Sequence, residues 1–270
     1  MKRIFLLSGL LVLFYLMPSC KSPTSPTPPA TVQSITVTSN SDLLYIGISE
    51  TFTATMTMSD GTSKPVTAGV WGGDTPSVAT VEAATGRVTI VGSGMVTIFV
   101  DYQGRRGTKV IRGLPNYQGT WSGSYYIVSC SASGNLSGSC TSFPVNQVFP
   151  TNLNLIQDRD RVTGKFYLGT LSADATGPIQ TDGQLLLVGK IVYDIWSIDV
   201  SWRMMSATPG KITGSLSEIF LAAGYSGDIR ISANIRDLNR TSTMTTELAP
   251  GGPRLLNPTL EDLIRALVGR

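Results

Sequence analysis

The most informative absence in this sequence is histidine, because the 270-residue chain contains none. Without an imidazole, the chain cannot build a Ser-His-Asp triad, a Cys-His dyad, a His-ligated zinc site or a 2-His-1-carboxylate iron site. Charged residues are also sparse, at 14% of the chain. Removing Lys2 and Arg3 from the 21 basic residues leaves 19, against 18 acidic ones. This balance gives no electrostatic reason to expect nucleic-acid binding.

Little catalytic chemistry remains once histidine is excluded. The chain contains no phosphate loop, no nucleophile elbow and no EF-hand spacing. Asp158 and Asp160 alternate with arginines in "QDRDR", which is typical of a solvated turn rather than an acid/base pair. Asp194 and Asp199 have opposite strand parity and are expected to face opposite sides of a sheet. We therefore expect a protein that is not an enzyme, with no catalytic residue, metal or cofactor.

Cysteine is scarce, with three residues in all. Cys130 and Cys140 are ten positions apart across a Ser/Gly-rich stretch, and in an exported chain such a pair predicts a disulfide. A redox-active or metal-binding role fits poorly, because the spacing is not Cys-x-x-Cys and no further soft ligand is nearby. The third cysteine, Cys20, belongs to the N-terminal segment.

Residues 1–19 have the layout of an export signal. Lys2 and Arg3 precede an apolar run that ends at Met17, followed by "PSC". This run is shorter than the about 20 apolar residues that a transmembrane helix needs. A plain secretory signal is one interpretation, and cleavage elsewhere that leaves Cys20 as a free thiol is another.

The residues "LMPSC" also resemble the lipobox of bacterial lipoproteins, with Met17 standing where that family usually has Leu. The resemblance implies cleavage before Cys20, lipid modification of its thiol and membrane association through the lipid. Lys21, in place of the Asp that retains such proteins at the inner membrane, favours the outer membrane or cell surface. Residues 20–31 are rich in Pro, Ser and Thr, which predicts an extended, semi-rigid tether.

From Val32 onward the polar and apolar residues alternate with period two, which predicts half-buried strands. About seven short strands separated by Gly, Asp, Ser and Pro turns predict a β-sandwich over residues 32–112. The runs "VW", "PSVATV", "GRV", "GSG" and "VTI" resemble the group 2 bacterial Ig-like domain, although "WGGD" departs from the serines that the family prefers after Trp. The predicted core comprises Trp71, Val78, Val81, Val88, Ile90, Val96 and Ile98. The resemblance implies either a binding module, as in bacterial adhesins, or a stalk.

A linker at 113–118, "GLPNYQ", separates this domain from a second β region over 119–240. About eight strands joined by sequential hairpins, including the turn "TDG", predict an up-and-down β-barrel, with an irregular sandwich as the alternative. We interpret "YDIWSIDVSWRM" as a single long strand. One of its faces carries Trp196, Ile198, Val200, Trp202 and Met204.

The stretch "GTW" at 119–121 weakly resembles the Gly-x-Trp that begins lipocalin- and avidin-like barrels. That resemblance implies that Trp121 closes one end of a barrel. Trp121, Trp196 and Trp202 then either line a ligand cavity or fill a core, since eight strands leave room for both.

The tail, residues 241–270, is rich in Pro and Gly at first and ends in an amphipathic stretch, 258–268. Leu260, Leu263, Ile264, Leu267 and Val268 follow helical spacing. A helix of this length is marginal alone and needs a surface, either its own barrel or a partner.

Taken together, these features predict an all-β, exported lipoprotein of the cell envelope. We expect a non-enzymatic surface interaction protein of the adhesion type, with a protein or carbohydrate partner. The alternative is a carrier of a small apolar ligand in the barrel.

Overall fold

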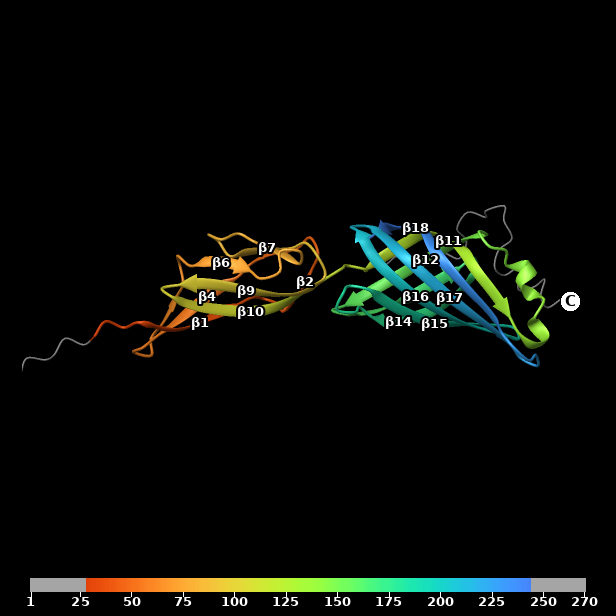
Figure 1. Ribbon diagram of the computed structural model, residues 1–270, viewed down its shortest axis with the longest axis horizontal. Coiled ribbons are helices and arrows are strands. Elements are labelled where there is room, and N and C mark those ends of the chain that lie inside the picture. Colours follow the sequence, from red (N-terminus) through yellow and green to blue (C-terminus); the bar gives the residue numbers. More distant parts are fainter. Residues whose placement is uncertain (1–27, 244–270) are drawn as a thin grey trace, which may run out of the picture.

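The computed structural model describes residues 28–243, which form two β domains lying end to end (Figure 1). The predicted export signal, Cys20, most of the predicted tether and the amphipathic stretch 258–268 lie outside the described residues. Within 28–243 the only helical elements are two short 3-10 helices, η1 (Gly134–Leu136) and η2 (Ser139–Ser142). None of the helices in this part of the chain is long and apolar enough to span a membrane.

The first domain is a sandwich built from three small sheets, in which short strands follow the turns expected from the sequence. One sheet has the order β1-β4-β5, the second β2-β10-β9-β6 and the third β3-β8-β7. The strand bounds are β1 Val32–Thr38, β2 Leu43–Tyr45, β3 Ser49–Thr51, β4 Thr53–Met58, β5 Ser63–Pro65, β6 Val70–Gly73, β7 Ala79–Val81, β8 Arg87–Ile90, β9 Gly94–Tyr102 and β10 Arg105–Leu114.

Alternate residues of these strands meet between the sheets, and the predicted core is present. Val88, Ile90, Val96 and Ile98 are fully buried or nearly so, whereas Val81 is only partly buried at the edge of the cluster. Gly86 has a φ of +70°, a left-handed conformation that favours glycine, and a Cβ there would lie 2.7 Å from the indole of Trp71.

The second domain is a closed barrel of eight strands in which each strand pairs with its sequence neighbour and β18 pairs back with β11. All pairs are antiparallel, which confirms the predicted up-and-down barrel. The strand bounds are β11 Gly119–Ala132, β12 Val148–Asp158, β13 Arg161–Leu168, β14 Leu171–Pro178, β15 Leu185–Tyr193, β16 Trp196–Thr208, β17 Lys211–Ala222 and β18 Ile229–Ser242.

One strand prediction is wrong. The segment "YDIWSIDVSWRM" is not a single strand, because β15 ends at Tyr193 and β16 begins at Trp196. The two strands form a tight hairpin in which Tyr193 pairs with Trp196. Asp194 supplies the turn with a φ of +52°, a left-handed conformation that Asp tolerates better than most residues. Within β16, the alternate residues from Trp196 to Met204 are buried as predicted, because their alternation depends only on the residues of that strand.

Glycines allow the barrel wall to close. At Gly164 in β13, a Cβ would lie 2.0 Å from the carbonyl oxygen of Asn154 on the neighbouring strand. At Gly214 in β17, it would lie equally close, 2.0 Å, to the carbonyl oxygen of Arg203. Each glycine is the fourth residue of its strand, and each follows a Thr in the sequence. These positions therefore serve as bends at which strands approach too closely for any side chain.

Candidate functional site: the barrel interior and its two ends

The three barrel tryptophans occupy three levels of the interior. Trp121 lies at the end nearest the Ig-like domain, Trp202 near the middle and Trp196 at the far end, because β11 and β16 run in opposite directions along the wall. All three indoles are almost completely buried. The interior is the candidate site, and its chemistry depends on what these rings contact.

At the near end, Trp121 is held by the segment that connects the domains. Its indole Nε1 donates a hydrogen bond of 2.8 Å to the carbonyl oxygen of Tyr117, and the guanidinium of Arg240 stacks 4.6 Å from its ring centroid. The Gln157 side chain fixes the same segment, since its Oε1 accepts from the Tyr117 N–H at 2.7 Å and its Nε2 donates to the Pro115 carbonyl at 3.1 Å. Trp121 therefore closes this end of the barrel, as the resemblance implied.

Tyr117 completes this closure and is fully buried. Its hydroxyl donates to the Gly183 carbonyl oxygen at 2.8 Å and accepts from the Ser206 N–H at 3.2 Å. Burial raises the pKa of the Tyr117 hydroxyl well above its usual range, so it stays protonated at all physiological pH values. The phenol thus ties the connecting segment to two turns of the barrel.

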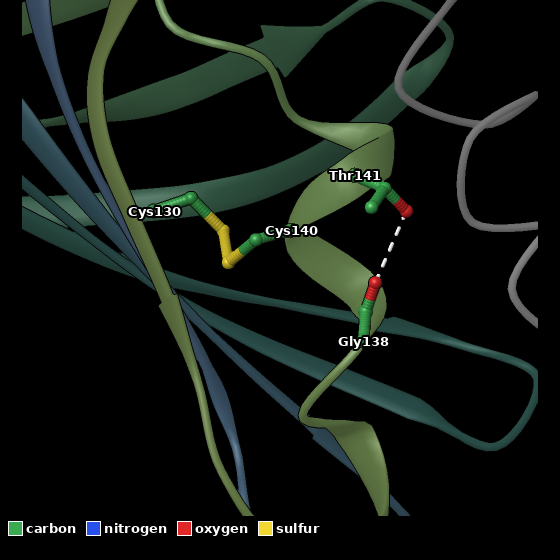
Figure 2. The surroundings of a disulfide bond; sticks show 4 residues. All are labelled: Cys130, Gly138, Cys140 and Thr141. Atoms are coloured by element: carbon green, nitrogen blue, oxygen red, sulfur yellow. Dashed lines mark hydrogen bonds between the residues drawn. A yellow bond between two sulfur atoms is a disulfide. The ribbon is translucent and has the colours of Figure 1, made fainter.

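At the far end, the loop between β11 and β12 folds into the barrel mouth. The disulfide Cys130–Cys140 joins β11 to η2, and the Thr141 hydroxyl donates to the Gly138 carbonyl across η2 (Figure 2). Beyond η2, the buried ring of Phe143 lies 5.5 Å from that of Phe220. The predicted disulfide is therefore present, and it anchors a plug rather than a free loop.

Aromatic rings fill the space between the two ends. Trp202 meets Phe166 edge-on with 6.3 Å between ring centroids, and Trp196 meets Phe220 edge-on at 6.4 Å. Offset and edge-to-face packing of this kind is the favourable arrangement for aromatic pairs. These ring contacts favour a filled core over a cavity, although the indole Nε1 atoms of Trp196 and Trp202 have no hydrogen-bond partner within the described residues.

One polar pair interrupts this apolar interior. Glu218 on β17 is only 1% exposed, although its neighbours in the inward-facing phase are Leu216 and Phe220. Glu218 Oε1 and the hydroxyl of the buried Tyr125 have no hydrogen-bond partner of regular geometry in the described part of the chain. The two groups are nevertheless close enough for each to affect the pKa of the other.

Burial dominates the electrostatics of this pair. It raises the pKa of Glu218 to about 7, with a smaller opposing effect from Tyr125, and it raises the pKa of the Tyr125 hydroxyl well above its usual range. Neither Glu218 nor Tyr125 was predicted as a site residue from the sequence. The signal was present for Glu218, since a carboxylate stands in the apolar phase of the alternating run "ITGSLSEIFLA".

The remaining carboxylates lie apart on the outside. Asp160 pairs with Arg112 at 3.1 Å and Asp199 with Lys190 at 3.2 Å, while Asp194 sits in the β15–β16 turn. Across residues 28–243, no three acidic or cysteine side chains gather in the manner of metal ligands. These positions offer no paired carboxylates for acid/base chemistry.

The junction between the domains is a packed contact. Arg112, at the end of β10, donates from its guanidinium to the carbonyl oxygens of Ile179 and Gln180, each at 2.9 Å, besides its ion pair with Asp160. Leu114 joins the core of the barrel, and Tyr45 of β2 packs against that core. The segment expected as a linker is therefore largely buried between the two domains.

Two hollows lie on the outer wall of the barrel. The larger, of about 530 Å³, crosses β12, β13 and β14, and the smaller, of about 170 Å³, crosses β16, β17 and β18 beside β11. Outward-facing residues line both of them, including Ile156 and Lys165 in the first and Ser201 and Ser217 in the second.

Comparison with known proteins identifies the first domain. Residues 31–109 match the family model of the bacterial Ig-like domain (group 2). This confirms the resemblance found in the sequence. No curated protein matches the chain.

Among solved structures, domains 5–6 of the S-layer protein SbsC align with 15% identity and a TM-score of 0.29, covering 75% of this chain and 97% of that one. Domains 1–6 of the same S-layer protein align with 13% identity and a TM-score of 0.29, covering 82% of this chain and 41% of that one. Alignments at this TM-score do not establish a shared arrangement.

Proposed function

We propose that this protein is an exported, lipid-anchored surface protein in which the Ig-like domain acts as a stalk and the barrel as a non-enzymatic interaction body. The packed junction between the domains carries this proposal. Arg112 contacts three groups of the barrel, and Tyr117 is buried in the barrel end. A stalk transmits position only if it does not hinge where it meets the body that it presents. The Ig-like match at 31–109 and the export signal in the sequence support a place at the surface.

The barrel interior argues against the alternative function of an apolar-ligand carrier. Ligand sites in β-barrels usually open at the mouth. Here Tyr117 and Trp121 close one mouth, and Phe143 closes the other. Native mass spectrometry of protein purified from its own host should therefore show the polypeptide and its lipid alone. A further retained small molecule would favour the carrier.

Anchoring is tested by fractionation. A Cys20→Ala variant should move from the membrane fraction to the soluble exported fraction, because the thiol that would carry the lipid is gone. A Cys130→Ala variant, which retains Cys20, should stay with the membrane. Equal membrane retention of the Cys20→Ala variant would exclude the lipoprotein model.

Rigidity is tested by distance measurement between spin labels at Thr55 in the Ig-like domain and Val192 on the barrel, both exposed. We expect a single narrow distance distribution in the parent protein and a broad one after Arg112→Ala. Arg87→Ala is the matched control, because Arg87 pairs with Glu82 inside the Ig-like domain. A distribution that is already broad in the parent protein would contradict a stalk that holds the barrel in place.

A further inference from the structure

We infer that the amphipathic segment 258–268 docks within its own chain, in the larger hollow of the barrel wall, across β12, β13 and β14. Four features of this wall support that assignment: its position, its lining, its charges and its distance from the end of β18. The inference concerns the folded chain alone and is independent of anchoring at a membrane.

Position comes first, because the wall beside the hollow is where the chain leaves the barrel. Ser242 is the last residue of β18 and pairs with Thr120. Thr120 pairs on its other side with Asn154, Asn154 with Lys165, and Lys165 with Asp174. The last three of these residues line the hollow. A single transverse row of the barrel thus joins the start of the tail to the far wall of the hollow.

The tail is long enough to reach. Four strand-to-strand steps of about 4.8 Å separate Ser242 from Asp174, which gives a span of about 19 Å. Residues 244–257 precede the amphipathic segment and can extend over about 46 Å at 3.3 Å per residue. Because the segment is tethered, its effective concentration at the wall is in the millimolar range, so a weak contact is sufficient.

The lining suits an aliphatic helix face. Ile156 projects from the outer wall with 53% of its surface exposed. It is in register with Thr163 on β13, which is in register with Thr176 on β14. Gly164 also lines the hollow, next to Thr163 and Lys165 on β13. The sequence of the segment predicts a stripe of aliphatic side chains on one face of the helix: Leu260, Leu263, Ile264, Leu267 and Val268. The 530 Å³ hollow, which spans three strands, can accept several such side chains.

Charge is complementary as well. Lys165 and Asp174 are opposite each other in the register of β13 and β14, yet no ion pair within residues 28–243 involves either of them. The segment carries Glu261 and Asp262 near its start and Arg265 one turn later. Docking would bring acidic residues within reach of Lys165 and a basic one within reach of Asp174.

The test is photo-cross-linking in the full mature chain. A benzoylphenylalanine at position 156 should cross-link within one chain to a tryptic peptide from 255–265. The same probe at position 221 is the matched control, since Leu221 is 41% exposed but lies on β17, four strands away from β13 around the barrel. A cross-link from position 156 only to a second chain, or none at all, would overturn the inference, as would equal yields from both positions.

A pair of tail variants separates docking from chance proximity. Leu263→Asn removes one side chain of the apolar stripe and should lower the yield from position 156 by about tenfold or more. Ala266→Asn places the same residue on the face away from the apolar stripe and should change the yield by less than about twofold, as expected for an exposed position. Equal effects of the two variants would exclude a specific face. The tryptophan fluorescence of the barrel should be the same in both variants, which verifies that the wall itself is folded.

Discussion

Glu218 makes the stability of the barrel depend on pH in a direction opposite to that of most carboxylates. Its carboxyl group is buried among apolar side chains, and none of the ion pairs among residues 28–243 includes it. Burial raises its pKa from 4.5 to about 7. The folded state therefore holds the proton more tightly than the unfolded state does. Stability should fall as pH rises from about 4.5 to about 7 and should not change further from this source above that range.

The magnitude follows from the same two values. Each pKa unit corresponds to about 1.4 kcal/mol, so the gap between 4.5 and about 7 amounts to about 3 kcal/mol lost across the window. Glu218→Gln keeps the size of the side chain and its capacity for hydrogen bonds but cannot ionise. The variant should match the parent protein near pH 4.5 and exceed its free energy of unfolding by about 3 kcal/mol at pH 8.

Urea unfolding at several pH values, followed by tryptophan fluorescence, measures this difference, since three of the four tryptophans lie in the barrel. The difference between variant and parent is the decisive quantity. Partly exposed carboxylates such as Asp101 and Asp228, whose pKa values are lowered by hydrogen bonds from Arg106 and Ser133 respectively, contribute an opposite trend that is common to both proteins. A difference that does not vary with pH would refute the reasoning.

Three further substitutions address the closure of the barrel, each measured by urea unfolding of the barrel. Gly164→Ala should lower the free energy of unfolding by about 1–3 kcal/mol, because its Cβ would overlap the backbone of β12. Gly138→Ala, with open space around it, should lower the free energy of unfolding much less. Equal losses in the two variants would contradict the close approach at Gly164. Replacing Cys130 and Cys140 together by Ser should lower stability by about 3 kcal/mol through the freed loop, and an unchanged free energy of unfolding would show that the disulfide adds nothing. Tyr117→Phe leaves a carbonyl and an N–H without their phenol partner and should cost about 1–3 kcal/mol, while a cost near zero would mean that the junction does not depend on these bonds.

The parts of this fold that the sequence predicted correctly are those encoded over short distances. Alternation of polar and apolar residues gave the inward face of Trp196, Trp202 and their neighbours, because strand parity depends only on adjacent residues. The disulfide was predicted correctly because Cys130 and Cys140 are only ten residues apart in the sequence. The hairpin at Asp194 was missed, because that turn lacks glycine and uses an aspartate in a left-handed conformation instead.

The parts that could not be predicted depend on register between distant strands. Tyr125 on β11 and Glu218 on β17 are far apart in the sequence. They come close because closure of the barrel pairs β11 with β18, which in turn pairs with β17. The junction has the same origin, since Arg112 meets Ile179 only once the barrel turns have been assembled. A linker is recognised in the sequence by its Gly, Pro and Asn content. That composition does not show that Tyr117, within the same segment, is buried in the end of the barrel.

Both ends of the barrel are closed by segments that do not belong to its wall, and this limits where the partner that we propose could bind. The connecting segment provides Tyr117 at one end, and the loop anchored by the disulfide provides Phe143 at the other. In barrels that carry ligands these ends form the entrance. Here one end contacts the Ig-like domain and the other is closed by the plug, so the outer wall, where both hollows are located, is the surface on which we expect a partner to bind. If segment 258–268 covers the hollow over β12–β14, a partner is left with the opposite side, over β16–β18, where serines, Arg203 and Asn234 offer hydrogen bonds. Substitutions at Arg203 should then weaken partner binding without altering the cross-link from position 156.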